Sequence, residues 1–261
     1  HQTISKLKGF KEWFDTLNLH ESQLVLGLSG SVKHLAESCA FEKLDKQLVI
    51  VTPTLLQATQ TYEELSEWYD DEVVHLFPVE ESLAADFSVV SPDVVSQRIR
   101  TLDFLSRGEK GIVIVPLSGI QKLLVPAAVW KKSSIELAMG SEIESMDAFV
   151  EQLVELGYRR ENMVATPGEF ALRGSIVDIY PLDQEYPLRL DFFDTEVDSI
   201  RAFNAETQRS MDVINEVRIL PATDLPLQKE AVWKAQAKIH ALYEKDVKAA
   251  QSPERKDQVS N

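Results

Sequence analysis

Cysteine is almost absent from this chain: Cys39 is the single example in 261 residues. One Cys excludes an internal disulfide and a metal cluster built on several thiolates. It also fits a reducing compartment, and we expect a cytoplasmic protein. Histidine is sparse as well. The five His residues are scattered without an HExxH spacing, so the sequence predicts no metal site.

Long apolar runs and an excess of positive charge are also missing. No stretch of about 18 uncharged apolar residues occurs, so the sequence predicts no membrane-spanning helix and no membrane partner. The 42 acidic residues outnumber the 27 basic ones, which gives a net charge of −15. That balance argues against a broad nucleic-acid-binding face on this chain. We therefore expect protein partners, with any DNA contact local or made by other parts of a longer protein.

The first part of the chain alternates short apolar runs with helical patterns. Apolar runs at 47–52, 73–77 and 111–116 read as strands, and the run at 111–116 is apolar throughout. The segment Ser91–Gly108 has Pro at its second position and ends in Gly, which is typical of a helix with both ends marked. The pattern predicts a parallel α/β sheet.

The pattern changes after about Trp130. An amphipathic helix is predicted over Ser145–Gly157, followed by strands with alternating polar and apolar residues in Glu169–Pro181 and Pro187–Phe193. Such alternation indicates an antiparallel or mixed sheet with one solvated face. A strand within 216–226 and a helix over 231–246 come next.

These patterns define a fold class and a domain organisation. We predict an α/β chain whose parallel-sheet domain is interrupted by a smaller α+β insertion with mixed or antiparallel strands. The first domain begins at residues 1–129, the inserted protein-interaction domain covers 130–214, and residues 215–261 return to the first domain and end in a helix. The chain starts at His1 rather than at Met, and we expect it to be a piece of a longer protein.

A degraded phosphate-binding pattern occupies residues 27–34, which read GLSGSVKH. It follows the apolar run Leu24–Leu26, which we predict to be a buried strand. In a functional P-loop, a second Gly and a Ser or Thr stand where this chain has Val32 and His34. A Cβ at Val32 hinders close approach to a phosphate, and an imidazole is a poor ligand for Mg²⁺. We define the vestigial nucleotide loop by Gly27, Gly30, Val32, Lys33 and His34.

Several segments together resemble the N-terminal module of the bacterial transcription-repair coupling factors. That module is itself similar to excinuclease B, the component of the bacterial excinuclease that binds damaged DNA. The most specific block is GEFALRGSIVDIYP with the following RLDFF, and the resemblance extends over nearly the whole chain. It rests on the segments GLSGSVKH, TPTLLQA, IVIVPLSGIQKLL, GYRRENMVATPGEFALRGSIVDIYP and PLRLDFFDTEVDSIRAFNAETQRS. The resemblance implies that the parallel-sheet domain is helicase-like.

The chain departs from excinuclease B in three places. Excinuclease B has a complete P-loop and a tyrosine-rich hairpin, whereas Phe77–Asp93 here is short and lacks Tyr. No DEAD-like acidic motif follows an apolar strand either. The resemblance therefore implies that this chain has no catalytic residues and no cofactor. ATP and Mg²⁺ would serve motor domains of the parent protein, an ATP-dependent DNA translocase that meets DNA and stalled RNA polymerase through its other domains.

The resemblance also implies a partner for the inserted domain, which in the family docks onto excinuclease A, another component of the same repair enzyme. Carried over position by position, the basic docking residues fall on Arg160, Arg173 and Arg189, and the acidic position falls on Asp191. A further basic position falls on Ala171, which departs from the pattern.

The alternation of residues points to the same surface. It puts Arg173, Arg189 and Asp191 on the solvent sides of their strands, and Phe193 beside them is an outward aromatic of the kind that interfaces favour. The leading hypothesis is a non-catalytic recruitment module for transcription-coupled nucleotide excision repair. Three alternatives stay open: ordinary solvated arginines, a nucleotide-dependent helicase or nuclease component that uses an unusual P-loop, and a surface masked in the full-length protein.

Overall fold

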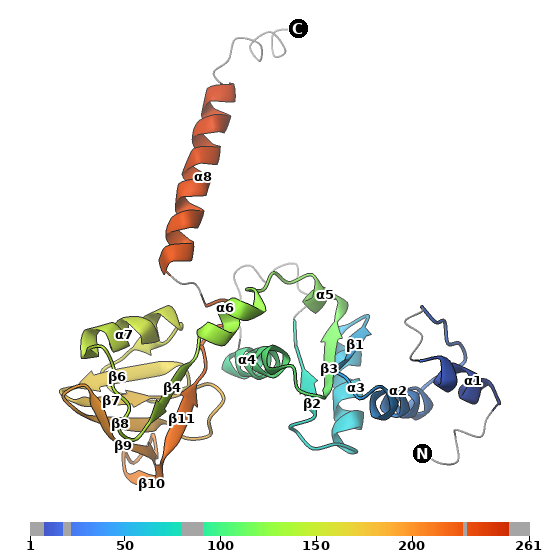
Figure 1. Ribbon diagram of the computed structural model, residues 1–261, viewed down its shortest axis with the longest axis horizontal. Coiled ribbons are helices and arrows are strands. Elements are labelled where there is room, and N and C mark those ends of the chain that lie inside the picture. Colours follow the sequence, from blue (N-terminus) through green and yellow to red (C-terminus); the bar gives the residue numbers. More distant parts are fainter. Residues whose placement is uncertain (1–7, 18–21, 80–90, 227–228, 251–261) are drawn as a thin grey trace.

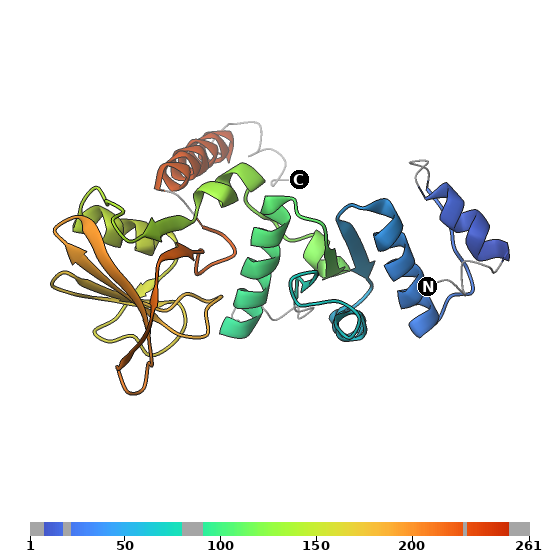
Figure 2. The same cartoon turned by 60° about the horizontal axis from the view of Figure 1, so that its bottom comes forward.

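Two sheet-containing parts lie side by side in the molecule (Figures 1 and 2). The computed structural model describes residues 8–17, 22–79, 91–226 and 229–250. The first part contains a parallel sheet, and the second contains a larger sheet that is antiparallel except at one edge. The prediction of parallel strands followed by a mixed or antiparallel region is confirmed.

The parallel sheet has the strand order β1-β3-β2. Strand β3 (Ile112–Pro116) lies between β1 (Leu48–Thr52) and β2 (Val74–Leu76) and is buried along its whole length, as its continuous apolar sequence predicts. Strand β1 alternates instead: Ile50 points into the core, whereas Val49 is exposed.

In three helices of the first part, local signals mark the start of the second and both ends of the third. The hydroxyl of Thr54 accepts a hydrogen bond from the Gln57 N–H at 3.3 Å, which caps the second of them. Gly108 ends the third in the left-handed region at φ 73°. Ser91 stands at the N-cap position of that helix without a side-chain capping bond, so Pro92 is its start signal. These helices are α2 (Ser31–Leu44), α3 (Leu55–Ser66) and α4 (Pro92–Arg107).

The core of the first part lies between this sheet and helices α2 and α3. Apolar side chains from the strands meet those of the helices, and Tyr69 packs edge-on against Phe41 with ring centroids 5.5 Å apart. The buried members are Phe41, Ile50, Ala58, Leu65, Val74, Leu76, Ile112 and Ile114.

Short elements connect the two parts. Helices α5 (Leu117–Ile120) and α6 (Ala127–Lys132) lead into β4 (Ile135–Ala138). Helix α7 (Met146–Glu155) then begins at Ser145, whose hydroxyl accepts a hydrogen bond from the Ala148 N–H at 3.1 Å. The helix predicted over Ser145–Gly157 is therefore confirmed.

The second part is built on a six-stranded sheet with the order β10-β9-β8-β7-β6-β5. Only the short edge strand β5 runs parallel to its neighbour; the other pairs are antiparallel and join strands that follow one another in the chain. The strands are β5 (Arg159–Arg160), β6 (Glu169–Arg173), β7 (Ile176–Ile179), β8 (Leu188–Phe193), β9 (Glu196–Phe203) and β10 (Ser210–Ile214).

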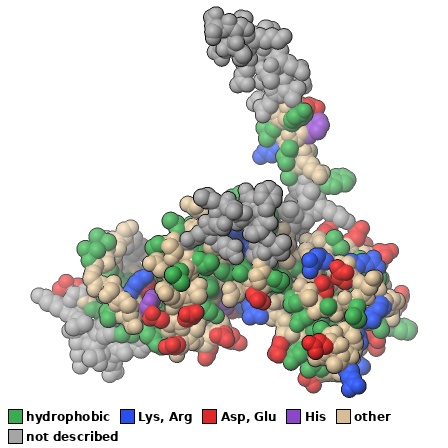
Figure 3. Space-filling model, turned by 180° about the vertical axis from the view of Figure 1, so that it is seen from behind, with side chains coloured by type: hydrophobic (Ala, Val, Ile, Leu, Met, Phe, Trp, Pro, Cys, Tyr) green, Lys and Arg blue, Asp and Glu red, His purple; other side chains and the backbone are tan. Residues whose placement is uncertain are grey.

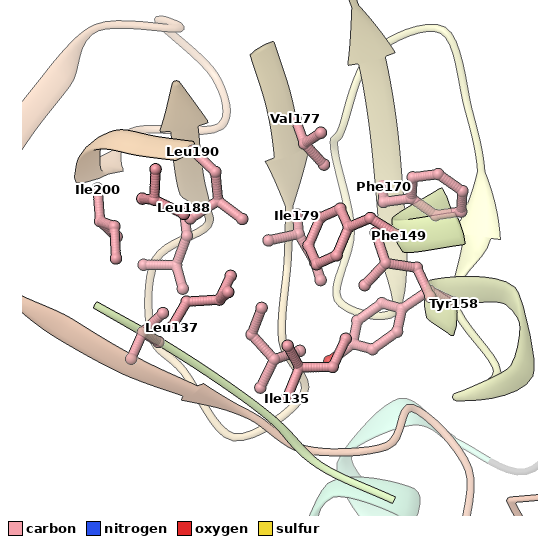
Figure 4. Packing of buried hydrophobic residues seen from close by; sticks show 14 of the residues in the cluster. Ile135, Leu137, Phe149, Tyr158, Phe170, Val177, Ile179, Leu188, Leu190 and Ile200 are labelled. Carbon is pink, nitrogen blue, oxygen red and sulfur yellow. The ribbon is translucent and has the colours of Figure 1, made fainter. Parts of the chain in front are cut away.

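One face of this sheet, the inner face, is covered by α7 and by a two-stranded ribbon of β4 with β11 (Glu216–Ile219). Figure 4 shows Leu137 of the ribbon and Phe149 of α7 among side chains from the strands. Burying about a dozen large apolar side chains in this way is the main stabilisation of the second part, at about 1.5–3 kcal/mol each. The inner face contributes Phe170, Val177, Ile179, Leu188, Leu190, Phe192, Val197 and Ile200.

The two parts share a third apolar cluster at their junction, in which Leu182 and Leu220 of the second part pack with Phe77, Ile99, Leu102, Val115 and Trp130. Just before Leu220, strand β11 pairs with β4 in the second part. The domain boundary that we placed at 214/215 stays a prediction. Helix α8 (Lys229–Ala250) projects away from both parts (Figure 1).

Candidate functional site

The face of the six-stranded sheet opposite α7 carries most of the predicted partner-binding residues; we call it the outer face. Cross-strand partners in a sheet point to the same side, so the ladder fixes which side chains are neighbours. Ala171 pairs with Asp178, and Asp178 pairs with Arg189. In the next row, Arg173 and Asp191 both pair with Ile176. The structure therefore brings Arg173, Arg189 and Asp191 together.

Asp178 organises this face, and it is fully buried. One of its carboxylate oxygens accepts from Arg189 Nε at 2.6 Å, and the other accepts from Arg189 Nη2 at 2.9 Å and from Arg173 Nη2. A fork of this kind is the strong, charge-assisted geometry of a guanidinium on a carboxylate. The sequence did not single out Asp178. The available signal was an Asp inside the apolar run IVDI.

Arg189 is held on several sides by this arrangement. Its guanidinium lies over the ring of Phe203, with 4.6 Å from Cζ to the ring centroid, and its Nη1 donates to the Gln208 carbonyl at 3.5 Å. The hydrogen bonds to Asp178 raise the pKa of the Arg189 guanidinium above its usual value. Only 21% of the side chain is exposed, so most of Arg189 is covered by contacts within the chain.

Arg173, by contrast, has 48% of its side chain exposed and uses one terminal nitrogen for Asp178. Its other donors face solvent and can meet a second carboxylate. Phe193, beyond Asp191 on the same strand, is 78% exposed at the end of β8. A half-exposed arginine and an exposed aromatic side chain therefore lie at this end of the outer face.

Arg160 lies apart from these residues. It is exposed in the edge strand β5 and pairs with Phe170, whose side chain is in the inner core, so the ladder places Arg160 on the opposite side from Arg173. Its neighbour Arg159 lies 3.7 Å from Glu169. Burial alone would raise the pKa of Glu169, but hydrogen bonds from the backbone of Ala165 and Thr166 lower it.

The charges of the second part are mixed rather than of one sign. Figure 3 shows basic and acidic side chains interspersed over the visible surface of this part. A mixed surface cannot attract a polyanion over a broad area, and it suits local, sterically specific pairing with another protein.

The vestigial nucleotide loop differs from the prediction at its start. Leu24–Leu26 forms no strand, and Leu24 and Leu26 are 84% and 78% exposed, so the prediction of a buried strand there is wrong. An apolar run becomes a strand only where a neighbour completes its hydrogen bonds, and within the described residues the parallel sheet consists of β1, β3 and β2. Gly27 and Gly30 have positive φ angles of 84° and 54°.

Helix α2 begins at Ser31, within this pattern, so Val32, Lys33 and His34 lie in its first turn. Val32 is exposed, and Lys33 Nζ lies 3.6 Å from Glu37 Oε1. His34 is buried, with Nδ1 2.9 Å from the Glu37 carboxylate and Nε2 3.7 Å from Glu64. Both ring nitrogens of His34 therefore face carboxylates of α2 and α3. Across the described ranges, no group of three or more His, Cys, Asp and Glu residues is arranged to hold a metal ion.

The tyrosine-poor segment Phe77–Asp93 lies partly outside the described residues, which resume at Ser91. In the part of the chain that the structure describes, no helix is both long enough and apolar enough to cross a bilayer.

Comparison with known proteins agrees with the resemblance seen in the sequence. Residues 135–225 match the family described as the UvrB interaction domain. The chain is 43% identical over 241 residues to the transcription-repair-coupling factor of Staphylococcus epidermidis. The corresponding factors of Staphylococcus haemolyticus and Bacillus subtilis are 41% and 38% identical over 241 and 242 residues.

Each of these matches covers 92% of the chain and 20% of the relative, so the chain spans about one fifth of the length of the relatives. The resemblance to the N-terminal module of the transcription-repair coupling factors is confirmed. The segment matched by the UvrB interaction domain includes the whole six-stranded sheet from β5 to β10 and therefore the outer face.

Proposed function

We propose that this chain is a non-catalytic protein-recruitment module of transcription-coupled nucleotide excision repair, and that its outer face binds excinuclease A. The observation that carries the proposal is that a half-exposed Arg173 and an exposed Phe193 lie at the same end of the outer face, in the segment that matches the UvrB interaction domain. An exposed aromatic beside an arginine is the composition of an interface hot spot.

The chemistry of the outer face agrees with a protein partner. Arg173 presents free donors in a planar fork that suits a carboxylate of the partner, and Asp191 adds an acceptor for a partner cation. Arg189 stabilises the outer face rather than binding the partner directly, because its own charge is matched by Asp178. Arg160 would belong to the same interface only if the partner wraps around the β5 edge.

We also propose that the parallel part is a helicase-like domain whose nucleotide loop no longer binds ATP. Two features support this: a Cβ at Val32 where a Gly is needed, and His34 engaged with Glu37 where a free hydroxyl is needed. Under this proposal the chain is not an enzyme and uses no cofactor. ATP and Mg²⁺ serve the motor domains of the parent, a cytoplasmic DNA translocase that displaces stalled RNA polymerase through its other domains.

The test is isothermal titration of purified excinuclease A into the chain. The double variant Arg173→Ala with Phe193→Ala is expected to weaken binding by tenfold or more, because it removes a free cation and an exposed anchor together. Alanine is preferable to a charge reversal at Arg189, where a new carboxylate would face the buried Asp178 and unfold the sheet.

The matched control is Lys132→Ala with Leu123→Ala, which also removes an exposed cation and an exposed apolar side chain, but in the connection between the two parts. It is expected to bind as the wild type does. Equal binding by both double variants would overturn the proposal. The rival enzyme hypothesis predicts heat on titration with Mg-ATP at millimolar concentration, and a flat titration would remove it.

A further inference from the structure

We infer that the outer face extends to Arg201 and Val213, and that Arg201 supplies the unpaired cation that meets a carboxylate of the partner. This inference rests on the proposed function and goes beyond the residues assigned there. It starts from the ladder: Arg189 pairs with Arg201, and Arg201 pairs with Val213. The row that begins at Asp178 therefore continues across β9 to the edge strand β10.

Charge distinguishes Arg201 from its neighbour in this row. Asp178 balances Arg189 through two hydrogen bonds. Arg201 is exposed, and within the described residues its side chain makes no ion pair or hydrogen bond. Because Asp178 already balances the charge of Arg189, Arg201 is the cation of this row whose charge is left for an incoming carboxylate.

Two apolar side chains are exposed on the edge strand beside Arg201. Val213 is 60% exposed and shares the outer face with Arg201, and Met211 in the same edge strand is also exposed. Strand β10 pairs with β9 on one side, and within the described residues no other strand pairs with its second side. An exposed cation next to exposed apolar side chains is complementary to a carboxylate that is flanked by apolar groups.

The occupant is then a surface of excinuclease A that presents such a carboxylate. Arg173 and Arg201 lie on either side of the fixed pair of Asp178 and Arg189. The partner would thus meet two accessible cations, separated by a charge-balanced centre. A partner with one acidic side chain for each of them fits this spacing best.

The experiment compares the binding of excinuclease A to Arg201→Glu, to Lys132→Glu and to the wild type. Arg201→Glu is expected to weaken binding tenfold or more, while its melting temperature stays close to that of the wild type, because Arg201 is exposed and its neighbour Arg189 is already paired with Asp178. Lys132→Glu makes the same change of charge away from the outer face and is expected to bind like the wild type.

The variant Arg201→Gln removes the positive charge without adding a negative one. Its affinity for excinuclease A tests the same contact if Glu at this position disturbs the strand. Binding of Arg201→Glu or Arg201→Gln within twofold of the wild type would overturn the inference and leave the proposed function intact. Failure of the wild type to bind excinuclease A would instead overturn the proposed function. Weaker binding of the Arg201 variants, with an unchanged melting temperature, supports both the inference and the proposed function.

Discussion

Asp178 shows how one side chain decides what its neighbours are free to do. It is fully buried and accepts hydrogen bonds from Arg189 at both carboxylate oxygens, so loss of Arg189 would leave the buried charge with only the contact that Arg173 makes. Arg173 shares the same carboxylate but keeps half of its side chain in solvent. Two arginines that are equivalent in the sequence pattern therefore differ in their surroundings: Arg189 is held within the chain, and half of the Arg173 side chain is open to solvent.

Asp183 is a residue whose charge opposes folding. It lies in the loop between β7 and β8 at the junction of the two parts, and its Oδ1 is buried without a hydrogen-bond partner in the part of the chain that the structure describes. Burial raises the pKa of the Asp183 carboxyl; nearby Arg100 lowers it, and nearby Asp103 raises it. The folded chain therefore holds this proton more tightly than the unfolded chain does.

The variant Asp183→Asn should reveal that cost as a pH-dependent gain in stability. As the pH rises above the ordinary Asp pKa of about 3.9, the unfolded wild type ionises more readily than the folded state, so the wild type loses stability that Asn retains. We expect the melting temperature of the variant to exceed that of the wild type at pH 7 by about 2–4 °C, the shift typical of ~1 kcal/mol in a chain of this size. Scanning calorimetry at pH 4 and pH 7 measures the difference.

The control for this experiment is Asp198→Asn, which removes an exposed carboxylate. Its effect on the melting temperature should be small at both pH values. If Asp183→Asn changed stability equally at pH 4 and pH 7, ionisation of Asp183 would not be the cause.

At the scale of single elements, the end of α7 packs closely against the segment that follows β11. Gly157 follows the helix with φ 91°, and a Cβ built there would lie 2.8 Å from Thr223 Cγ2. The Ala222 N–H donates to the Leu156 carbonyl at 2.8 Å across the same contact. The segment after β11 therefore packs on the helix end, and no side chain fits between them.

Replacing Gly157 by Ala should cost more than the same change at Gly174. Both glycines have positive φ, and a side chain in that region costs about 1–2 kcal/mol. A Cβ at Gly174 meets open space, whereas one at Gly157 must displace Thr223, which adds about 1–3 kcal/mol. Urea denaturation of the two variants measures the difference in the free energy of unfolding. Equal losses would mean that the contact with Thr223 gives way freely.

Local patterns predicted the elements whose signals are local. The helices α4 and α7, the apolar strand β3 and the alternating strand β8 all lie where the sequence indicates them. The prediction of a strand at Leu24–Leu26 was wrong, because an apolar sequence alone does not supply the neighbouring strand that its backbone hydrogen bonds need. The pairing of β4 with β11 could not be predicted from either segment alone, because the two strands are about 80 residues apart in the sequence.

The candidate site was predictable to the same extent. Alternation was enough to place Arg173, Arg189 and Asp191 on one face, since a strand repeats every two residues. It could not show that Asp178 binds Arg189, because that depends on the register between β7 and β8. The position of Arg201 in the same row depends on yet another register, that between β8 and β9.

At the scale of the whole molecule, a buried ion pair joins the two parts. Arg98 of α4 is buried; its Nε donates to the Pro78 carbonyl at 2.6 Å, and its Nη1 lies 3.2 Å from Asp224, beyond β11. Lys122 also lies 3.2 Å from Asp224. Ser96 of the same helix donates to the Leu182 carbonyl at 2.6 Å. Polar contacts therefore flank the apolar cluster that the two parts share.

The variant Asp224→Asn should loosen this junction and leave the six-stranded sheet intact. It leaves the Arg98 charge buried without its carboxylate. Such a change costs about 3–5 kcal/mol when an ion pair is fully buried, and less here because 15% of the Asp224 side chain is exposed. Hydrogen exchange followed by mass spectrometry should show faster exchange in α4 and in residues 220–226. Amides of β6 to β9 should keep their protection, because the buried residues of their core are not those of the junction, and only the partly buried Ala222 packs against both clusters.

Glu109→Gln is the matched control, since it removes a carboxylate from the exposed ion pair with Arg107, whose Nη1 lies 2.9 Å from Glu109 Oε1. Exposed pairs contribute about 0–1 kcal/mol, so exchange should stay close to that of the wild type. Faster exchange across β6 to β9 in Asp224→Asn would mean that the two parts unfold as one unit. In that case the outer face would depend on the parallel part for its stability, and the parallel part would contribute to recruitment by holding that face in shape.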